Sequence, residues 1–484
     1  MQSRVSPMTD ELREEARAIL GSLPCSIEMP AGTGKTELIV AMASEAAANG
    51  ERALILTHTN AGVDALRKRL ARHRVSPTTY HVDTITGWAV DLVRHYPTLS
   101  GVSLPAAVNP DDSELYILGA TRVARVEALV RMHRVSFRYL FVDEYQDCIV
   151  EHHDLVVALA AAIPQCAILG DPLQGIFDFR GSTLIDWSVH VHSQFPEYIR
   201  TYTPWRWINH NVSLGQWLLD IRPLMVADGT LDLSTVRIQG LEWKPAGSQN
   251  EIKAAYAAAK RAGSTVILHQ VREQHKTVAG RTGGLYSIME SLNGSYMRDL
   301  LQKLQDLSPD LYAAWLAMAA KNCFSGLADV KPTDIVRLQK NQTLIGLKRP
   351  TVNKTVAAIE SVRLTPTFTA LSQAMYEIAS AGEGTCYAHE AWFDIAKALA
   401  KAGLDPSQTP CQHLGMIRNR LRYSGRKTRE RMLSRTLLVK GLEYDHVIIA
   451  NADSIGDYKD LYVAMTRPRK TLTILSQSPI IKFK

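Results

Sequence analysis

The stretch MPAGTGKTELIV, residues 29–40, has the residue types and spacing of a site for a nucleoside triphosphate. The apolar run before it predicts a buried strand over residues 25–29, and the run after it predicts a helix that ends at Gly50. A strand, a glycine-rich loop and a helix in this order direct backbone N–H groups and the positive end of the helix at phosphate oxygens. We therefore expect the nucleotide to contact Gly32, Thr33, Gly34, Lys35 and Thr36.

Two side chains of this loop have specific tasks. Lys35 would reach the β- and γ-phosphates, and the hydroxyl of Thr36 would ligate Mg²⁺. One position departs from the usual eight-residue pattern, because Met29 stands where that pattern begins with glycine. A bulky residue is tolerated there only if the strand does not turn tightly as it ends.

A pair of acidic residues follows in RYLFVDEYQD, residues 138–147. An apolar strand that ends in adjacent carboxylates places Asp143 to hold Mg²⁺ through water. It also places Glu144 to orient and deprotonate an attacking water. The plain alternative is an acidic cap at the end of a strand. The position of this pair after a phosphate loop favours the catalytic interpretation.

Three further polar residues are candidates to complete a hydrolytic site. Gln174 follows an apolar run in AILGDPLQG, where its amide would reach the γ-phosphate or the attacking water. Arg206, in TPWRWINHN, and Arg467, in LYVAMTRPRKTL, would supply positive charge to the transferring phosphoryl group. An isolated arginine is more often a surface residue, and the order of these segments along the chain is what favours the catalytic role. The predicted catalytic set is Lys35, Glu144, Gln174, Arg206 and Arg467.

Composition and charge limit the class of protein. The chain has 484 residues, of which 46% are apolar and 21% charged, and a formal net charge of +7. These values are typical of a globular protein of several domains, and the basic balance permits a polyanionic partner. No apolar run is long enough for a membrane span and the N-terminus lacks a signal-peptide pattern, so we expect a cytoplasmic protein. The six cysteines are scattered and indicate neither a zinc cage nor a disulfide framework.

Positive charge is concentrated in RNRLRYSGRKTRERMLSR, residues 418–435, which contains seven arginines and one lysine against a single glutamate. A solvated loop is the alternative to a nucleic-acid contact in such a segment. We take Arg420 and Arg422 as candidate contacts to DNA phosphates.

The order of the motifs resembles that of UvrD/Rep-type superfamily 1 DNA helicases. The segments that carry the resemblance are PAGTGKT, LTHTN, VDTITGWA, DEYQD, GDPLQGIFDFRGS, WRW, KGLEYDHVII and YVAMTRPRKTL. The resemblance implies an α/β fold with two RecA-like P-loop motor domains, each with a parallel sheet and a small helical insertion. It also implies that ATP and Mg²⁺ bind in the cleft between the motors and that their hydrolysis drives movement along single-stranded DNA, 3′ to 5′.

The family implies roles for several further residues. Trp205 stands where an aromatic residue stacks on the adenine, and Glu443 corresponds to the glutamate that bonds the ribose. Thr59 and Asn60 would hold DNA phosphates at the start of a helix. The residues Phe177, Phe179 and Arg180 lie where the family contacts DNA bases. The alternative for the two phenylalanines is a place in the core.

Some positions depart from the family pattern. Leu12 stands where a glutamine reads the adenine edge, so hydrolysis of other nucleoside triphosphates is an open alternative. Glu37 replaces an arginine that often covers the base, and His58 replaces an aromatic phenylalanine. The apolar Leu437 and Leu438 replace polar residues that face DNA.

The motif positions predict how the chain is divided. Residues 1–90 and 137–204 would form the first motor domain, and residues 205–280 and 431–484 the second. Residues 91–136 would be a small helical insertion in the first, and residues 281–430 a helical insertion that ends in the arginine-rich segment.

Two functions of different class fit these observations. The first is a free-standing DNA translocase or helicase that acts on single-stranded or partly duplex DNA. The second is a DNA-sensing ATPase subunit that regulates a separate nuclease in a bacterial anti-phage defence complex, because the size and motif set resemble the helicase-like component of Gabija-type systems. A binding protein with an inactive motor is disfavoured, since every phosphate-handling position is filled.

Overall fold

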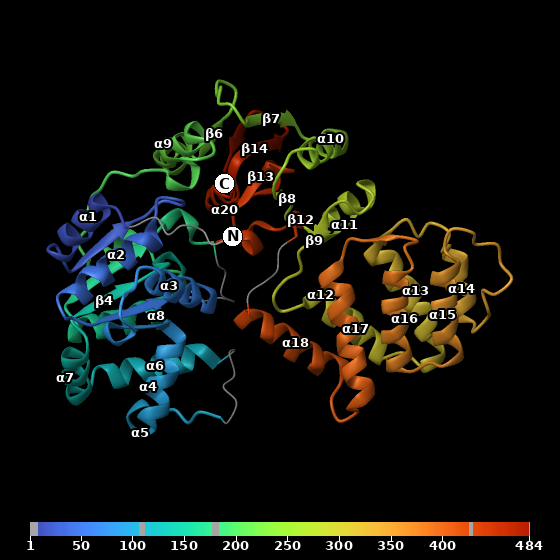
Figure 1. The fold of residues 1–484 in the computed structure, drawn as a ribbon, viewed down its shortest axis with the longest axis horizontal. Coiled ribbons are helices and arrows are strands. Elements are labelled where there is room, and N and C mark those ends of the chain that lie inside the picture. The colour runs from blue at the N-terminus through green and yellow to red at the C-terminus, as the bar shows by residue number, and fades with distance from the viewer. Residues whose placement is uncertain (1–7, 106–111, 177–182, 425–428, 484) are drawn as a thin grey trace. The chain divides into compact units, whose positions relative to one another are not determined.

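The computed structural model describes residues 8–105, 112–176, 183–424 and 429–483 (Figure 1). The chain forms two compact units, Met1–Arg222 and Pro223–Lys484. Within the described ranges, no helix combines the length and the apolar character that a bilayer crossing requires.

The first unit is built on a parallel sheet of five strands in the order β1-β5-β4-β2-β3. Its strands are β1 (Cys25–Glu28), β2 (Ala53–Thr57), β3 (Tyr80–Thr84), β4 (Tyr139–Val142) and β5 (Gln165–Gly170). Its helices are α1 (Asp10–Leu20), α2 (Lys35–Ala48), α3 (Asn60–Arg72), α4 (Ile85–His95), α5 (Pro97–Ser100), α6 (Ser113–Ala124), α7 (Glu127–Ser136) and α8 (Val150–Ala162). The helix α9 (Val212–Asp228) runs across the division between the units.

Helices pack on both faces of this sheet, because the apolar side chains of its strands point alternately to one face and the other. In β2, Ile55 packs into a core with residues of α1, α2 and α3, whereas Leu54 and Leu56 pack with residues of α4, α6 and α8. Because successive side chains of a strand point to opposite faces, a continuous apolar strand fills both cores. The polar motifs lie in the loops that follow the ends of the strands.

The second unit contains a parallel sheet of six strands in the order β7-β14-β13-β8-β12-β9. The strands are β7 (Leu241–Pro245), β8 (Thr265–Leu268), β9 (Ser287–Ile288), β12 (Arg431–Ser434), β13 (Tyr444–Ile449) and β14 (Pro468–Ser476). Two short antiparallel pairs accompany it, β6 (Thr230–Asp232) with β15 (Ile480–Lys482) and β10 (Phe324–Ser325) with β11 (Thr385–Cys386).

Most of the second unit's helices lie between β9 and β12 in the sequence. They are α12 (Ser295–Gln305), α13 (Tyr312–Cys323), α14 (Pro332–Gln339), α15 (Asn353–Leu364), α16 (Phe368–Ser380), α17 (His389–Leu404) and α18 (Pro410–Ser424). The remaining helices are α10 (Ser248–Ala259), α11 (Arg272–Arg281), α19 (Thr436–Val439) and α20 (Tyr458–Met465). Trp315 and Trp392 are buried in one apolar core that also includes sheet residues such as Ile267 and Leu433.

The predicted fold class is confirmed: the chain is α/β, with two parallel sheets that are consistent with two RecA-like domains. The units divide at Arg222, whereas the sequence analysis begins the second motor domain at residue 205. Contacts between Trp205–Trp207 and the phosphate loop, described below, explain why this segment groups with the first unit.

Candidate functional site

The phosphate loop occupies residues 29–34, between the end of β1 and the start of α2. Gly32 and Gly34 have φ angles of 76° and 92°, in the left-handed region that glycine adopts with little strain. Thr33 closes the turn, because its hydroxyl and its N–H both donate to the carbonyl of Pro30, at 2.7 and 3.2 Å. The loop's curvature is therefore set by its own residues. The loop leads directly into the N-terminus of α2, a helix of 14 residues.

Met29 does not take part in the turn. Its N–H donates to the carbonyl of Gly170 at 2.7 Å, which continues the pairing of β1 with β5 by one residue. Its side chain is buried in the core that faces α1–α3. Glycine is thus not required at this position, and the departure from the usual pattern is compatible with a phosphate loop.

Lys35, at the first position of α2, reaches the two acidic residues that follow β4. Its ammonium lies 3.3 Å from Asp143 Oδ1 and 2.7 Å from Glu144 Oε2. Burial alone would lower the pKa of Lys35, but the two carboxylates outweigh burial and raise this pKa above its ordinary value. Burial raises the pKa of Asp143, and the Lys35 ammonium opposes that rise. The predicted catalytic lysine and the two predicted acidic residues therefore form one charge cluster.

Glu144 has an unusual backbone conformation for a residue with a side chain. Its φ is 54°, in the left-handed region. Its N–H donates to Asp143 Oδ1 at 2.8 Å, and Gln146 Nε2 donates to its carboxylate at 2.6 Å. Strained residues of this kind persist where the surrounding contacts over-determine them, and they cluster at active sites. The contacts that maintain this conformation keep the carboxylate of Glu144 beside Lys35.

Asp171, directly after β5, connects the pieces of the site and is fully buried. Its Oδ2 accepts from the N–H of Ala31 at 3.0 Å and from Gln174 Nε2 at 2.9 Å. Its Oδ1 accepts from Arg222 Nη1 at 2.8 Å, and its own N–H donates to Gln146 Oε1 at 3.0 Å. The carboxylate of Asp171 thus joins the phosphate loop to the predicted γ-phosphate sensor Gln174, and its backbone N–H joins both to the segment that contains Glu144.

The sequence analysis assigned no role to Asp171, Gln146 or Arg222. A usable signal existed for Asp171, which lies at a strand end in the Gly-Asp-Pro of the quoted motif, and for Gln146 within DEYQD. Arg222 had none, because it lies 51 residues after its partner, inside α9 and outside any motif.

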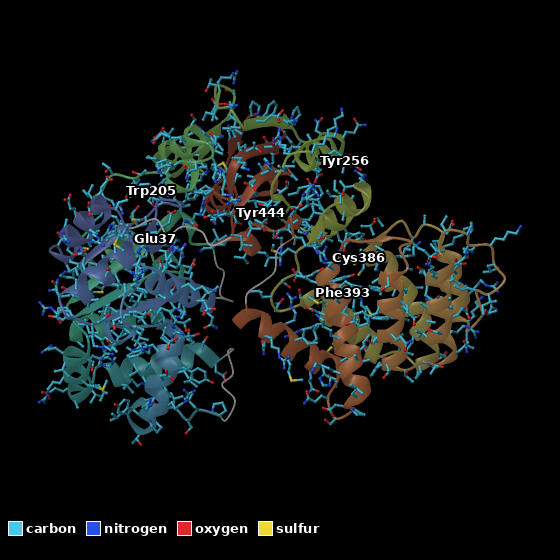
Figure 2. All side chains as sticks on the ribbon, in the orientation of Figure 1. Glu37, Trp205, Tyr256, Cys386, Phe393 and Tyr444 are labelled. Carbon is cyan, nitrogen blue, oxygen red and sulfur yellow. The ribbon has the colours of Figure 1, made fainter. Side chains whose placement is uncertain are left out.

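The segment Trp205–Trp207 lies against the phosphate loop of the same unit. The N–H of Arg206 donates to the carbonyl of Gly32 at 3.0 Å. A methyl group at Gly32 would stand 2.7 Å from the ring of Trp207, and one at Gly34 would stand 3.2 Å from the ring of Trp205. Trp207 is buried, whereas Trp205, labelled in Figure 2, is 51% exposed beside the loop. An exposed aromatic ring next to a phosphate loop is suited to stack on a nucleotide base.

Glu443 and Arg467 lie together in the second unit, at the amino ends of β13 and β14. Tyr444 and Pro468 are paired across these parallel strands, and the N–H of Tyr444 donates to the carbonyl of Arg467 at 3.1 Å. The guanidinium of Arg467 is buried and donates to the Val463 carbonyl at 2.9 Å. Glu443 is exposed.

Thr59 and Asn60 begin α3 and are exposed. The hydroxyl of Thr59 accepts from the N–H of Gly62 at 3.0 Å, so it caps the helix. The neighbouring His58 turns inward, with Nε2 3.1 Å from Cys148 Sγ. The exposed start of a helix with hydroxyl and amide side chains can hold a phosphate oxygen.

The other predicted DNA contacts lie in two further segments of the chain. Phe177, Phe179 and Arg180 lie outside the described residues. Arg420 is exposed on α18; Arg422 belongs to the same helix, but its side chain is outside the described residues. Arg418, in the same basic run, is buried and pairs with Glu390 and Asp394, at 3.0 Å each. This arginine anchors α18 to α17.

Two departures from the family pattern also have structural roles. Leu12 packs partly buried against the core that faces α1–α3. Glu37, labelled in Figure 2, pairs with Arg69 of α3 at 2.9 Å and so links α2 to α3. Arg69 belongs to a second basic run, LRKRLARHR at residues 66–74, and Glu37 neutralises part of its charge.

The described residues fit a nucleotide with Mg²⁺. The carboxylate of Asp143 is buried beside the ammonium of Lys35, and carboxylate and hydroxyl oxygens are the ligands that Mg²⁺ prefers. Asp143 and Thr36 are therefore the residues that would hold the ion. The positive-φ glycines and the start of α2 provide the N–H groups that phosphates require.

The fold and the site define a P-loop α/β protein in which an acidic pair and a linked glutamine lie beside the glycine loop. Comparison with known proteins finds a match over part of the chain: residues 102–188 match the family model of the UvrD/REP helicase N-terminal domain. No curated protein sequence matches the chain. The resemblance to UvrD/Rep helicases is thus confirmed, and it points to an ATP-dependent DNA helicase that uses ATP and Mg²⁺. The resemblance to Gabija-type components has no support in these comparisons.

Proposed function

We propose that this chain is an ATP-driven DNA translocase of the UvrD/Rep type that moves 3′ to 5′ on single-stranded DNA and separates strands. The observation that carries the proposal is the cluster of Lys35, Asp143 and Glu144 at the mouth of the glycine loop, in a chain with a UvrD/REP helicase segment. The direction of movement follows from the family resemblance alone.

The proposed roles follow from the contacts of each residue. Lys35 would leave the carboxylates to contact the β- and γ-phosphates, and Asp143 and Thr36 would hold Mg²⁺, which supplies charge neutralisation of the phosphate oxygens. Glu144 would accept the proton of the attacking water. Gln174, held by Asp171, would orient that water or sense the γ-phosphate.

The remaining proposed roles concern the base, the ribose and the transition state. Trp205 would stack on the base, and Glu443 would bond the ribose. Arg206 and Arg467 would stabilise the negative charge of the transferring phosphoryl group. On the DNA, Thr59, Asn60 and the α18 arginines Arg420 and Arg422 would contact phosphates, and Phe177, Phe179 and Arg180 would contact bases.

Steady-state ATP hydrolysis with and without single-stranded DNA tests the proposal. We expect DNA to stimulate hydrolysis about tenfold, and Lys35→Ala to reduce the stimulated rate by about a hundredfold or more, because phosphate-charge stabilisation is the main catalytic term. Thermal unfolding of Lys35→Ala checks that the variant folds. A rate that does not respond to DNA would contradict the translocase proposal.

Strand displacement on duplexes with a 3′ or a 5′ single-stranded tail tests direction. Unwinding from the 3′ tail supports the proposal, and unwinding from the 5′ tail alone overturns the direction. DNA-stimulated hydrolysis without any displacement would instead favour an ATPase subunit that signals to another enzyme.

A further inference from the structure

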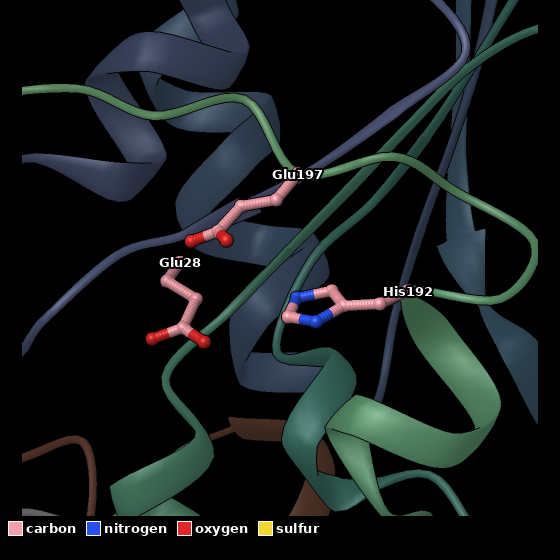
Figure 3. A group of neighbouring side chains, drawn as sticks. All are labelled: Glu28, His192 and Glu197. Carbon is pink, nitrogen blue, oxygen red and sulfur yellow. The ribbon is translucent and has the colours of Figure 1, made fainter.

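A group of potential metal ligands lies in the first unit, apart from the nucleotide site. Glu28, His192 and Glu197 each offer a ligand atom, and these atoms all lie within 4.8 Å of one another (Figure 3). None of the three belongs to the nucleotide-contacting, Mg²⁺ or DNA sets described above.

Backbone contacts hold the three residues in place. Glu28 is the last residue of β1. The segment with Glu197 pairs with the same strand, because the N–H of Ser26 donates to the carbonyl of Pro196 at 2.9 Å and the N–H of Tyr198 donates to the carbonyl of Ser26 at 2.8 Å. His192 follows the π-helical turn Trp187–Val191, where its N–H donates to the carbonyl of Trp187 at 3.1 Å.

The ring of His192 provides an independent indication of a ligand. Its Nε2 atom is buried and makes no hydrogen bond to any residue in the described parts of the chain. Figure 3 shows this ring edge directed toward the carboxylates of Glu28 and Glu197. A buried ring nitrogen without a partner costs free energy unless a donor, a water or a cation satisfies it.

The charges around the group are also unbalanced. Arg222 is shared between two carboxylates, because its Nη2 lies 3.9 Å from Glu28 Oε2 while its Nη1 bonds Asp171 Oδ1 at 2.8 Å. A divalent cation between the two carboxylates would remove their mutual repulsion.

We propose that Glu28, His192 and Glu197 form a binding site for one divalent transition-metal ion, with Zn²⁺ as the best-fitting ion. One imidazole and two carboxylates are ligands that Zn²⁺ takes at about 2.0–2.2 Å, with water in the remaining position. At these bond lengths the ligand atoms of a tetrahedral ion are about 3.4 Å apart, so the most widely separated atoms of the group would close by up to about 1.5 Å on binding. The exposed side chain of Glu197 can rotate to make this adjustment.

The bound ion would cross-link two segments of the first unit and so stabilise it. The ion would tie residues 192–197 to the end of β1, one residue before Met29 and the phosphate loop. This inference does not depend on the proposed helicase function, since it concerns metal binding and stability and not hydrolysis.

Zinc titration of the full chain, stripped of metal and kept in excess Mg²⁺, tests the proposal. Competition with a colorimetric zinc chelator gives stoichiometry and affinity. We expect the wild-type chain to bind one Zn²⁺ that His192→Ala and Glu197→Gln each bind at least about tenfold more weakly, because each variant removes one of three ligands. We also expect Zn²⁺ to raise the thermal unfolding midpoint of the wild-type chain more than that of either variant.

Matched substitutions at exposed residues of the same unit serve as controls. His95→Ala and Glu127→Gln remove an imidazole and a carboxylate elsewhere, and both should bind Zn²⁺ like the wild type. Glu197→Gln decides the question if His192→Ala does not fold, since Glu197 is exposed. Equal Zn²⁺ binding by the wild type and the folded variants would overturn the site. Displacement of Zn²⁺ by Mg²⁺ at comparable concentrations would overturn the assignment to a transition metal.

Discussion

At the scale of single residues, Asp171 connects the parts of the proposed nucleotide site. Its two oxygens serve Ala31 of the phosphate loop, Gln174 and Arg222, and the side chain has no exposed surface. A carboxylate can accept from all of these donors at once, whereas an amide cannot, because its NH₂ group would face another donor. The sequence at residue 171 thus controls the geometry of three separate segments.

We predict that Asp171→Asn weakens both stability and ATP use. Breaking a buried pair by removing one charge costs about 3 kcal/mol, and the loop loses the acceptor of the Ala31 N–H. Thermal unfolding should show the loss of stability, and steady-state kinetics should show a KM for ATP raised about tenfold with a smaller change in kcat. The exposed Asp10→Asn is the control. A lowered unfolding midpoint with an unchanged KM would limit Asp171 to a purely structural role.

A second residue makes the stability of the first unit sensitive to acid. Burial lowers the pKa of His152, on α8, to about 4, from an ordinary value of 6.5. Because the unfolded chain binds a proton at higher pH than the folded one, this residue's contribution is fully present above pH 6.5 and is lost as pH falls toward 4. At pH 5 the loss amounts to about 2 kcal/mol.

We predict that His152→Gln reduces the acid sensitivity. Glutamine does not titrate and can still accept the hydrogen bond from the Ile149 N–H, which His152 Nδ1 accepts at 3.3 Å. Denaturant unfolding at pH 7 and pH 5 should show a difference between the two pH values that is smaller in the variant by about 2 kcal/mol. Equal differences in both proteins would mean that other groups, such as His275 and His389 with their lowered pKa values, account for the acid loss.

At the scale of elements, the start of α3 combines a structural and a proposed binding role. Thr59 caps the helix through the N–H of Gly62, and its exposed position leaves the helix start open to a phosphate. Aspartate caps a helix as well as threonine does but carries a negative charge, so it separates the two roles.

We predict that Thr59→Asp keeps the stability of the chain and weakens its binding to single-stranded DNA about tenfold, through repulsion of the phosphate. Thr59→Ser should leave both unchanged. Fluorescence anisotropy with a labelled oligonucleotide measures the affinity, and thermal unfolding measures the stability. Wild-type affinity in Thr59→Asp would remove the start of α3 from the DNA interface.

The elements that carry local motifs were predictable from the sequence. The strand before the phosphate loop, the helix after it and the apolar strand before Asp143 all appear, as β1, α2 and β4. Apolar periodicity and glycine spacing are local properties, so no tertiary information was needed for them. The contact of Trp205 with Gly34 was not predictable, because it depends on the path of a chain segment far from the loop in sequence. The same holds for the pairing of Arg222 with Asp171.

At the scale of the whole molecule, the net charge of +7 can attract DNA only through basic side chains that are exposed and not paired with acidic residues. Arg418 is paired and buried, and Arg69 is paired with Glu37, so part of the positive charge in both basic runs serves the fold. Arg420, two residues further along α18 than Arg418, is exposed. The basic runs are therefore not uniform binding surfaces, and their contribution to DNA affinity has to be measured residue by residue.

We predict that the double substitution of Arg420 and Arg422 to Ala flattens the salt dependence of DNA binding. Each phosphate contact to single-stranded DNA contributes about −0.7 to the slope of log K against log salt concentration, so the double variant should lose about 1.4. Anisotropy titrations over a range of salt concentrations measure the slope. Arg131→Ala, an exposed arginine on α7 paired with Glu127, is the control and should leave it unchanged. An unchanged slope in the double variant would assign the exposed side of α18 to a role other than DNA binding. If the single variant Arg420→Ala loses as much of the slope as the double variant, the helix makes one phosphate contact, through Arg420.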